Sequence, residues 1–256
     1  MKSITLAALI CATVSGCHWD PEPPTPIDPS NTTYVVTVGM ENSRFAGECP
    51  GAGLDCTRMT ELLSKYTPNI VSYQSEKASK VAVVNAMKAA VEKAELFIFY
   101  YSGHGGSQWF YDTGAEEVDG KDEFLCLNDT MMRDNEIWDI ISKAKGRVVL
   151  MIDACHSQTV FRCPGFTLKH CIPLTATHNE EGALRMCCMS GCPDSDYSYG
   201  SSSGGKFTNT FRKYFDAGLS YDQIWEKVEN DKTLQQFEQV QRTLMGGFDT
   251  LRPIFK

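Results

Sequence analysis

A histidine and a cysteine each come three positions after the end of an apolar run of this chain. His104 comes just after the segment 97–101, and Cys155 comes just after the segment 148–152. A free thiol, whose ordinary pKa is about 8.5, is mostly protonated at neutral pH, and an adjacent imidazole can accept that proton. Either residue alone is better explained as a loop histidine or a buried thiol. Their shared placement after two apolar runs instead predicts a cysteine nucleophile with a histidine base, which is chemistry suited to peptide-bond hydrolysis.

Backbone groups beside these side chains complete the predicted site. Gly103 and Gly105 flank His104, and a residue without a Cβ atom lets a substrate backbone approach closely. The backbone amides of Gly105 and Cys155 are candidate donors of an oxyanion hole. His156 is a rival base, but a side chain directly adjacent to the nucleophile is expected to have poor geometry. We therefore assign catalysis to His104 and Cys155.

The elements that position these residues are expected to form one mostly parallel sheet. A strand buried on both faces reads as a continuous apolar run, and alternation of strands with helices implies parallel pairing. Residues just past the carboxyl ends of such strands share one edge of the sheet, where open α/β folds place their sites. The periodicities predict strands over 34–40, 69–73, 96–101, 147–152, 184–189 and 239–245, and helices over 54–66, 78–93, 136–144, 207–216 and 221–230 with Ser220 as the N-cap of the last.

Four motifs make the chain resemble the caspase-like cysteine peptidases, and among these the metacaspases and their bacterial relatives. The motifs are YSGHG at 101–105, DGKDEFLC at 119–126, DACHS at 153–157, and MSGCPD at 189–194 followed by GGKFT at 204–208. His104 precedes Cys155 by 51 positions, close to the separation of about 50 in caspases. The resemblance extends from Tyr34 to the C-terminus. It implies a caspase-like three-layer α/β/α sandwich with a mostly parallel six-stranded sheet, and a Cys–His endopeptidase.

The resemblance also implies a preference for Arg or Lys before the cleaved bond. Animal caspases, which bind aspartate, carry Gln two residues before the nucleophile, whereas Asp153 stands there in this chain. The matching pocket positions are Asp153, Ser102 and Asp55. A carboxylate in a partly dry pocket forms a charge-assisted pair with a guanidinium. For Asp55, capping of the helix that follows it is an equally good explanation.

Many metacaspases need calcium, and the resemblance implies Asp119, Asp134 and Asn135 as candidate ligands, although the chemistry itself requires no cofactor. Calcium takes six to eight oxygen ligands, so carboxylates with an amide are suitable. The sequence departs from the family here, because it has Asp134-Asn135-Glu136 where adjacent aspartates are common. The alternative is that Asp134 caps the helix predicted over 136–144.

The N-terminal segment is expected to direct export. The uncharged stretch 4–16 is shorter than the roughly 20 residues of a membrane span and suits a secretory signal. Because VSGC at 14–17 resembles a bacterial lipobox, we expect a lipoprotein signal peptide over 1–16 and lipidation of Cys17; an ordinary signal peptide cut nearby is the alternative. Several acyl chains would anchor the protein stably in the cell envelope. His18 replaces the aspartate that retains lipoproteins at the inner membrane, which favours the outer membrane.

The rest of the chain is expected to be a proline-rich tether over 17–33 and one peptidase domain over 34–256. The net charge of −8, without a basic stripe, argues against nucleic acid as a partner. The expected partners are protein or peptide substrates and, through the lipid, the membrane; we expect a monomer. The loop 158–181 is a candidate for self-cleavage after Arg162 or Lys169.

Two features of the sequence stay open. Disulfides are compatible with export, and Cys49 with Cys56 or Cys163 with Cys171 would close short loops.

Two other functions also fit the chain: a caspase-fold envelope lipoprotein that binds peptides without cutting them, and an Asp-specific peptidase. The presence of both His104 and Cys155 favours activity over the first. Asp153, together with the lack of an obvious arginine near the predicted pocket, argues against the second.

Overall fold

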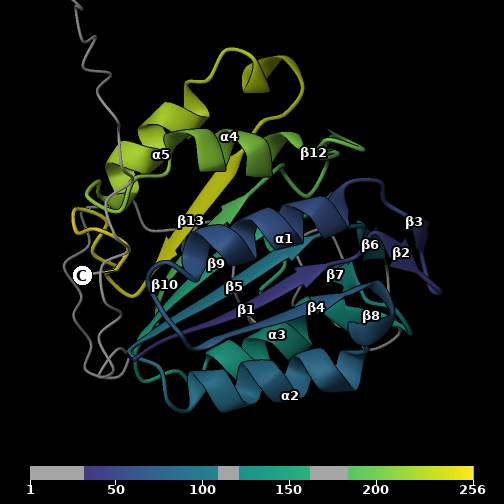
Figure 1. Ribbon diagram of the computed structural model, residues 1–256, viewed down its shortest axis with the longest axis horizontal. Coiled ribbons are helices and arrows are strands. Elements are labelled where there is room, and N and C mark those ends of the chain that lie inside the picture. The colour runs from purple at the N-terminus through teal and green to yellow at the C-terminus, as the bar shows by residue number, and fades with distance from the viewer. Residues whose placement is uncertain (1–31, 109–120, 162–183, 256) are drawn as a thin grey trace, which may run out of the picture.

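The computed structural model describes residues 32–108, 121–161 and 184–255 (Figure 1). Its centre is a six-stranded sheet in the order β13-β10-β9-β5-β1-β4. Neighbouring strands pair in parallel except β10 and β13, which are antiparallel. The strands of this sheet are β1 (Thr33–Gly39), β4 (Ile70–Gln74), β5 (Leu96–Ser102), β9 (Arg147–Asp153), β10 (Arg185–Ser190) and β13 (Gln241–Met245). The predicted six-stranded, mostly parallel sheet is confirmed.

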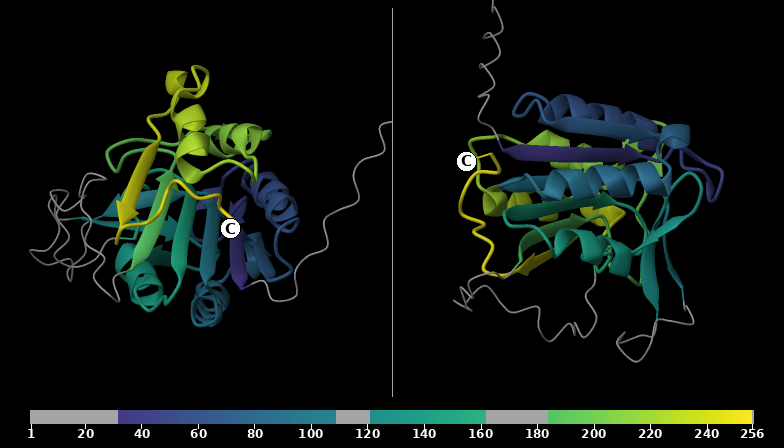
Figure 2. Two further views of the ribbon diagram at one scale, coloured as in Figure 1. Left: turned by 90° about the vertical axis from the view of Figure 1, so that its left-hand side faces the viewer. Right: turned by 90° about the horizontal axis from the view of Figure 1, so that it is seen from below.

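Helices cover both faces of the sheet and make three layers (Figures 1 and 2). One face carries α1 (Ala52–Leu63), α4 (Lys206–Tyr214) and α5 (Tyr221–Glu229), and the other carries α2 (Lys80–Val91) and α3 (Asp134–Ile141). Ser220 caps α5 as predicted, because its hydroxyl accepts from the Gln223 backbone N–H at 3.2 Å. No helix within the described ranges is long and apolar enough to cross a bilayer.

Alternation along the central strands divides the core into two apolar clusters. Val36 and Phe99 pack on the α2 and α3 side, whereas their chain neighbours Val35 and Tyr100 pack on the α1, α4 and α5 side. All four side chains are at most 1% exposed. A strand covered on both faces needs apolar residues at every position, which explains the continuous runs in the sequence.

Short elements lie beyond the carboxyl ends of the central strands. They comprise β2 (Asn42–Ser43), β3 (Gly47–Glu48), a 3-10 turn (Ser75–Lys77), the sheet β6 (Gly105–Gln108), β7 (Asp122–Cys126) and β8 (Met131–Arg133), the ribbon β11 (Gly200–Ser201) and β12 (Gly204–Gly205), and a 3-10 turn (Leu234–Gln236). The sheet β6-β7-β8 occupies the long loop between β5 and α3. Of these elements, β3, β11 and β12 contribute residues to the candidate site.

Parts of the predicted domain organisation fall outside the described residues. These parts include the signal peptide, Cys17, most of the tether, Asp119 and the loop with Arg162 and Lys169. β1 begins at Thr33, which is the last residue of the predicted tether.

Candidate active site

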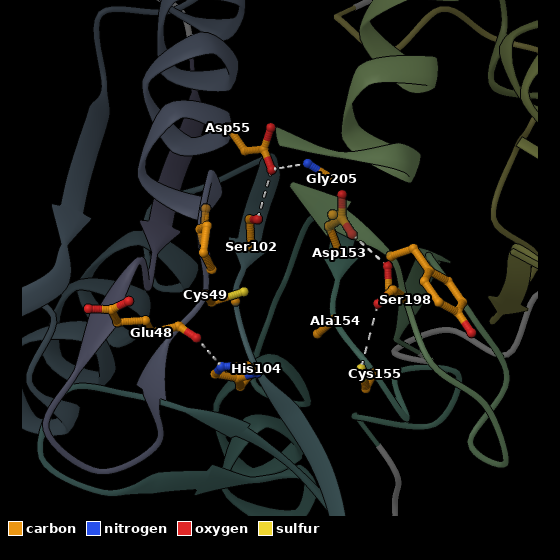
Figure 3. Close-up of a pocket in the computed structure, with 15 residues that line it drawn as sticks. Glu48, Cys49, Asp55, Ser102, His104, Asp153, Ala154, Cys155, Ser198 and Gly205 are labelled. Atoms are coloured by element: carbon orange, nitrogen blue, oxygen red, sulfur yellow. Dashed lines mark hydrogen bonds between the residues drawn. The ribbon is translucent and has the colours of Figure 1, made fainter. Parts of the chain in front are cut away.

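His104 and Cys155 lie at the same rim of the sheet because their strands are neighbours. β5 pairs with β9 in parallel, with Ser102 opposite Asp153 at their carboxyl ends. Each reactive residue comes two positions later in its chain. Both line one pocket of about 220 Å³, and Figure 3 shows them on opposite sides of it. The structure thus brings the two predicted catalytic residues to one pocket, as expected from their place at the strand ends.

Residues of β3 hold the His104 ring in place. Nε2 of His104 lies 2.8 Å from the backbone carbonyl oxygen of Glu48. A carbonyl oxygen can only accept, so Nε2 carries the hydrogen, and in a neutral ring Nδ1 is then the nitrogen able to accept a proton. The contact therefore fixes the tautomer that a general base requires.

The surroundings of the Cys155 thiol favour its protonated form. Its Sγ donates to the backbone carbonyl of Ser198 at 3.8 Å. Burial raises the pKa of Cys155, and the charges of Asp153 and Glu238 add to this effect against the Ser198 contact. No direct hydrogen bond joins Cys155 to His104 among the described contacts, a common state of catalytic pairs before substrate binds. The thiol therefore needs a base to become a nucleophile.

Gly105 allows the two sides of the site to approach each other. A Cβ atom built on Gly105 would lie 2.2 Å from the backbone oxygen of Cys155 and 3.1 Å from Cβ of Ala154. Any side chain here would collide with the Cys155 backbone. The glycine after His104 is thus required by close packing, in addition to its predicted role in the oxyanion hole.

His156 is directed away from the pocket. Its backbone is left-handed, with φ of 50°, and its Nδ1 lies in hydrogen-bond contact with the Asp194 backbone oxygen. The ring meets Tyr197 edge-on, with centroids 5.3 Å apart. These contacts agree with the assignment of the base to His104.

The three residues predicted to select the substrate meet at one end of the pocket (Figure 3). Asp55 is 1% exposed; its Oδ2 accepts from the Ser102 hydroxyl at 3.1 Å and from the Gly205 N–H at 2.7 Å. Its Oδ1 has no hydrogen-bond partner among the described residues. Burial, with the charge of Asp153 added, raises the pKa of Asp55 to about 7. Leaving that oxygen without a donor is costly, which adds to the effect of burial on this carboxyl.

The alternative role of Asp55 as a helix cap is wrong. The N-cap of α1 is Gly51, with φ of 92°, and Asp55 lies one turn inside the helix. From there the Asp55 carboxyl contacts the Gly205 N–H of β12 and lines the pocket.

Asp153 is held by three donors. Its Oδ2 accepts from the backbone N–H and the hydroxyl of Thr208 at 2.9 and 2.7 Å, and its Oδ1 lies 2.7 Å from the Ser198 hydroxyl. Burial raises the pKa of Asp153, and these hydrogen bonds oppose the rise. No Lys or Arg of the described residues forms an ion pair with Asp55 or Asp153. The pocket is therefore acidic without an internal counter-cation.

The structure adds pocket residues that sequence reasoning missed, namely Glu48, Cys49, Ser198 and Tyr199. Cys49 is a half-buried free thiol, and Cys56 is also free, so the proposed disulfide between them is wrong. Burial, followed by the charge of Asp153, raises the pKa of Cys49 to about 11. Their spacing in the sequence does not indicate a place in the pocket, because tertiary packing alone brings them there. Cys163 and Cys171 lie outside the described residues.

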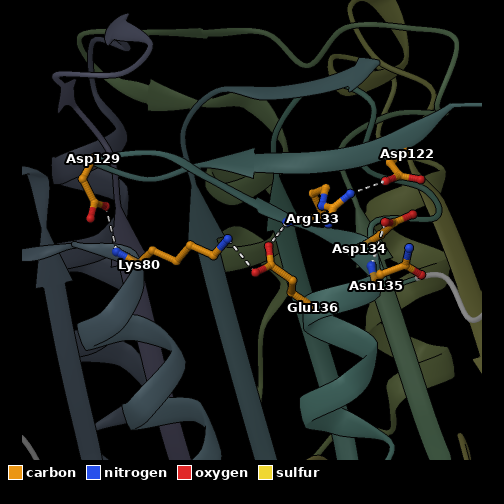
Figure 4. Close-up of polar contacts among 7 residues, drawn as sticks. All are labelled: Lys80, Asp122, Asp129, Arg133, Asp134, Asn135 and Glu136. Carbon is orange, nitrogen blue, oxygen red and sulfur yellow. Dashed lines mark hydrogen bonds and ion pairs between the residues drawn. The ribbon is translucent and has the colours of Figure 1, made fainter. Parts of the chain in front are cut away.

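The described residues do not by themselves fit calcium (Figure 4). Asp134 is fully buried and its Oδ1 accepts from the Asn135 backbone N–H at 2.7 Å. Within the described ranges, no three His, Cys, Asp or Glu side chains form a group able to hold a metal ion. Asp119, the third candidate, lies outside those ranges. The calcium site stays a prediction, and no catalytic step is routed through it.

The helix-capping alternative for Asp134 is also wrong. The helix α3 begins at Asp134, two residues earlier than predicted, and its N-cap is Arg133. Oε2 of Glu136 accepts from the Arg133 backbone N–H at 3.0 Å, and Glu136 also pairs with Lys80 (Figure 4). Asp134 is thus the first residue of the helix rather than its cap.

The sequence of this chain matches a known protein family. The family model of the caspase domain matches residues 34–245, which is most of the chain and contains both His104 and Cys155. This protein belongs to the caspase domain family. The prediction of a caspase-like fold is therefore confirmed, and the chain belongs to a family of cysteine peptidases.

Solved structures share the caspase fold at low sequence identity. A Geobacter sulfurreducens protein is 19% identical with a TM-score of 0.66, and the match covers 88% of this chain and 98% of that one. Caspase-1 from Spodoptera frugiperda is 12% identical with a TM-score of 0.56, covering 93% and 95%. At these identities the likeness supports the fold alone. No curated protein matches the sequence significantly.

Proposed function

We propose that this caspase domain is a cysteine endopeptidase that hydrolyses peptide bonds after Arg or Lys. The observation that carries the proposal is the acidic end of the pocket. Two buried carboxyls, Asp55 and Asp153, share a cavity with Cys155 and His104, and neither forms an ion pair with a Lys or Arg of the described residues. A buried acidic pair of this kind is stabilised by a cation from outside.

Arginine fits this end of the pocket better than lysine. This end of the pocket brings the Asp55 and Asp153 carboxyls together, and a planar guanidinium presents several N–H donors in a fixed fork. The ammonium of lysine offers a compact charge with three donors, so lysine is the second choice. An aspartate side chain would meet two carboxyls of like charge, which disfavours the Asp-specific alternative.

Hydrolysis follows in two chemical steps. Nδ1 of His104 takes the thiol proton, and Sγ of Cys155 forms a bond to the substrate carbonyl carbon. The negative charge that develops on the carbonyl oxygen is stabilised by the backbone N–H groups of Gly105 and Cys155. The imidazolium then gives its proton to the leaving amine nitrogen as the C–N bond breaks, leaving a thioester.

Water completes the cycle. His104 removes a proton from a water molecule, whose oxygen attacks the thioester carbonyl, and the C–S bond breaks with return of that proton to the thiolate. The carbonyl of Glu48 keeps the imidazole oriented through both steps, because its contact at 2.8 Å is made by the nitrogen that does not transfer protons.

Further parts of the proposal rest on the sequence and on the resemblance to metacaspases. These are activation by calcium through Asp119, Asp134 and Asn135, self-cleavage after Arg162 or Lys169, and lipid attachment at Cys17 in the cell envelope. Metabolic labelling with a radioactive fatty acid should mark the protein and should fail to mark a Cys17→Ser variant. Intact-mass spectrometry of active protein should detect the fragment ending at Arg162 or Lys169.

A peptide library tests the proposed specificity. Incubation with a proteome-derived mixture, followed by mass spectrometry of new termini, should show cleavage almost only after Arg and Lys, and none with Cys155→Ala. Cleavage after Asp would replace this proposal with the caspase specificity. Tight binding of Arg peptides without cleavage by the wild-type protein would instead identify a peptide-binding caspase fold.

A further inference from the structure

A third buried carboxyl lies directly behind the acidic end of the pocket. Glu238 comes from the segment before β13 and is 4% exposed. Its Oε1 accepts from the Tyr199 backbone N–H at 2.6 Å and lies 3.0 Å from the Ser198 hydroxyl. Ser198 and Tyr199 both line the pocket. Glu238 therefore holds a pocket wall from behind, although it is about 40 residues away in sequence.

One hydrogen atom is shared by two carboxyls in this arrangement. The Ser198 hydroxyl lies 2.7 Å from Asp153 Oδ1 and 3.0 Å from Glu238 Oε1, and a hydroxyl has a single hydrogen to donate. Asp153 takes it at the shorter distance and has two further donors on Thr208. Glu238 Oε2 has no partner among the described residues. A proton on Glu238 completes the chain from Glu238 through Ser198 to Asp153.

We propose that Glu238 is a positioning residue for the basic-residue pocket, which carries a proton in the free protein and releases it to solvent when a cationic side chain binds. This inference rests on the proposed function of the pocket. Proton release gives Glu238 a negative charge behind the wall that the guanidinium contacts, and the hydrogen bond from the Tyr199 N–H keeps that wall in place. Cation selection is thereby coupled to pH.

The surroundings of Glu238 support this assignment. Burial, with the charge of Asp153 added, raises the pKa of Glu238 to about 8, and Lys206 acts in the opposite direction. The Lys206 ammonium lies over the Phe237 ring, 4.5 Å from its centroid, and Cys155 also lies within electrostatic reach of Glu238. Lys206 thus opposes the rise in the pKa of Glu238, and within the described ranges the two form no ion pair.

Calorimetry on the full-length Cys155→Ala protein tests the coupling without turnover. An Arg peptide and its citrulline counterpart, which has the same shape without the charge, are titrated in two buffers of different ionisation enthalpy, which gives the number of protons released. Glu238→Gln, added to Cys155→Ala, keeps an acceptor for Tyr199 but cannot ionise. Glu229→Gln removes an exposed carboxyl of α5 as the matched control.

We expect the Arg peptide to release protons from the Cys155→Ala protein at about pH 7.5, and Glu238→Gln to lower that number by roughly half a proton or more. The Arg-to-citrulline affinity ratio should also fall about tenfold in Glu238→Gln at about pH 9, the size expected for one charge acting across the pocket at an effective dielectric of about 20. Glu229→Gln should leave both values unchanged.

Two results overturn the inference, and they are distinguishable. Equal proton release and an equal affinity ratio in Glu238→Gln, with the Arg preference intact, remove the role of Glu238 alone. Binding of citrulline as tight as that of Arg to the parent protein would overturn the proposed function and, with it, this inference.

Discussion

The protein should lose stability between about pH 6 and about pH 9, and replacing Glu123 by glutamine should make this loss smaller. Glu123 lies in β7 and is 1% exposed. Its Oε2 accepts from the Thr159 hydroxyl at 2.9 Å, while the same hydroxyl lies 2.6 Å from Asp194 Oδ2. Burial, with the charge of Asp194 added, raises the pKa of Glu123 to about 8. This carboxyl is therefore neutral in the folded protein at neutral pH.

The magnitude follows from the difference between the folded and unfolded pKa. The pKa of Glu123 rises from 4.5 to about 8 on folding, so the folded state holds more protons than the unfolded state between these values. The free energy of unfolding is then highest at low pH and falls as the pH rises through this window. Between about pH 6 and about pH 9 the loss from this one carboxyl is about 2 to 3 kcal/mol.

Urea unfolding of the wild-type protein and Glu123→Gln at the two pH values measures this loss. Glutamine keeps an acceptor for Thr159, so the two proteins should be similar at about pH 6, and the variant should be the more stable one by about 2 kcal/mol at about pH 9. Asp55 and Glu238 titrate in both proteins and cancel in the difference. Glu61→Gln, which removes an exposed carboxyl of α1, is the control. A pH-independent difference between wild type and Glu123→Gln would refute the reasoning.

Three further predictions concern the site. The KM for an Arg peptide should rise as the pH falls below about 7, since the pKa of Asp55 lies near that value, and Asp55→Asn should raise KM about tenfold and flatten this limb; an unchanged profile would exclude Asp55 from the pocket. Gly105→Ala should lower kcat/KM by about 100-fold, because its Cβ would lie 2.2 Å from the Cys155 carbonyl oxygen; wild-type kinetics would contradict the packing. Alkylation of Cys155 by iodoacetamide, followed by mass spectrometry, should accelerate with rising pH past neutrality because burial raises the pKa of that thiol; a fast rate at about pH 6 would contradict this.

The strands and the reactive pair are predictable because local sequence determines them. A strand buried on both faces leaves a continuous apolar run, so the prediction over 147–152 agrees with β9 (Arg147–Asp153) to within one residue. A parallel sheet brings the carboxyl ends of neighbouring strands together. These two rules place His104, Ser102, Asp153 and Cys155 at one rim without any knowledge of side-chain packing.

Residues that reach the pocket by tertiary packing are not predictable in this way. Glu48 contributes a backbone oxygen from a two-residue strand, and its side-chain identity carries no signal for that role. Glu238 follows Gln235, Gln236 and Phe237 and has the sequence context of an exposed polar residue, yet it is buried behind Ser198. Long-range contacts that no periodicity encodes determine both positions.

Helix ends account for the remaining differences. The periodicity predicts a helix from 54, where Asp55 would be near the cap, but Gly51 adopts a left-handed conformation and α1 begins at Ala52. The two additional residues at its start place Asp55 inside the helix, where its carboxyl lines the pocket instead of capping the helix. In α3, the Glu136 side-chain carboxyl accepts from the Arg133 backbone N–H, and the helix starts two residues earlier than predicted. A short polar residue near a helix start is thus weak evidence for capping when another residue can end the preceding segment.

Turnover of matched fluorogenic peptides tests the central claim most directly. The wild-type protein, under reducing conditions, is assayed beside Cys155→Ala on peptides that differ only in Arg, citrulline or Asp before the reporter group. The account predicts hydrolysis of the Arg peptide, at least about 100-fold slower hydrolysis of the citrulline peptide, none of the Asp peptide, and no activity in Cys155→Ala. Equal turnover of the Arg and citrulline peptides, or Arg cleavage that survives in Cys155→Ala, would contradict it.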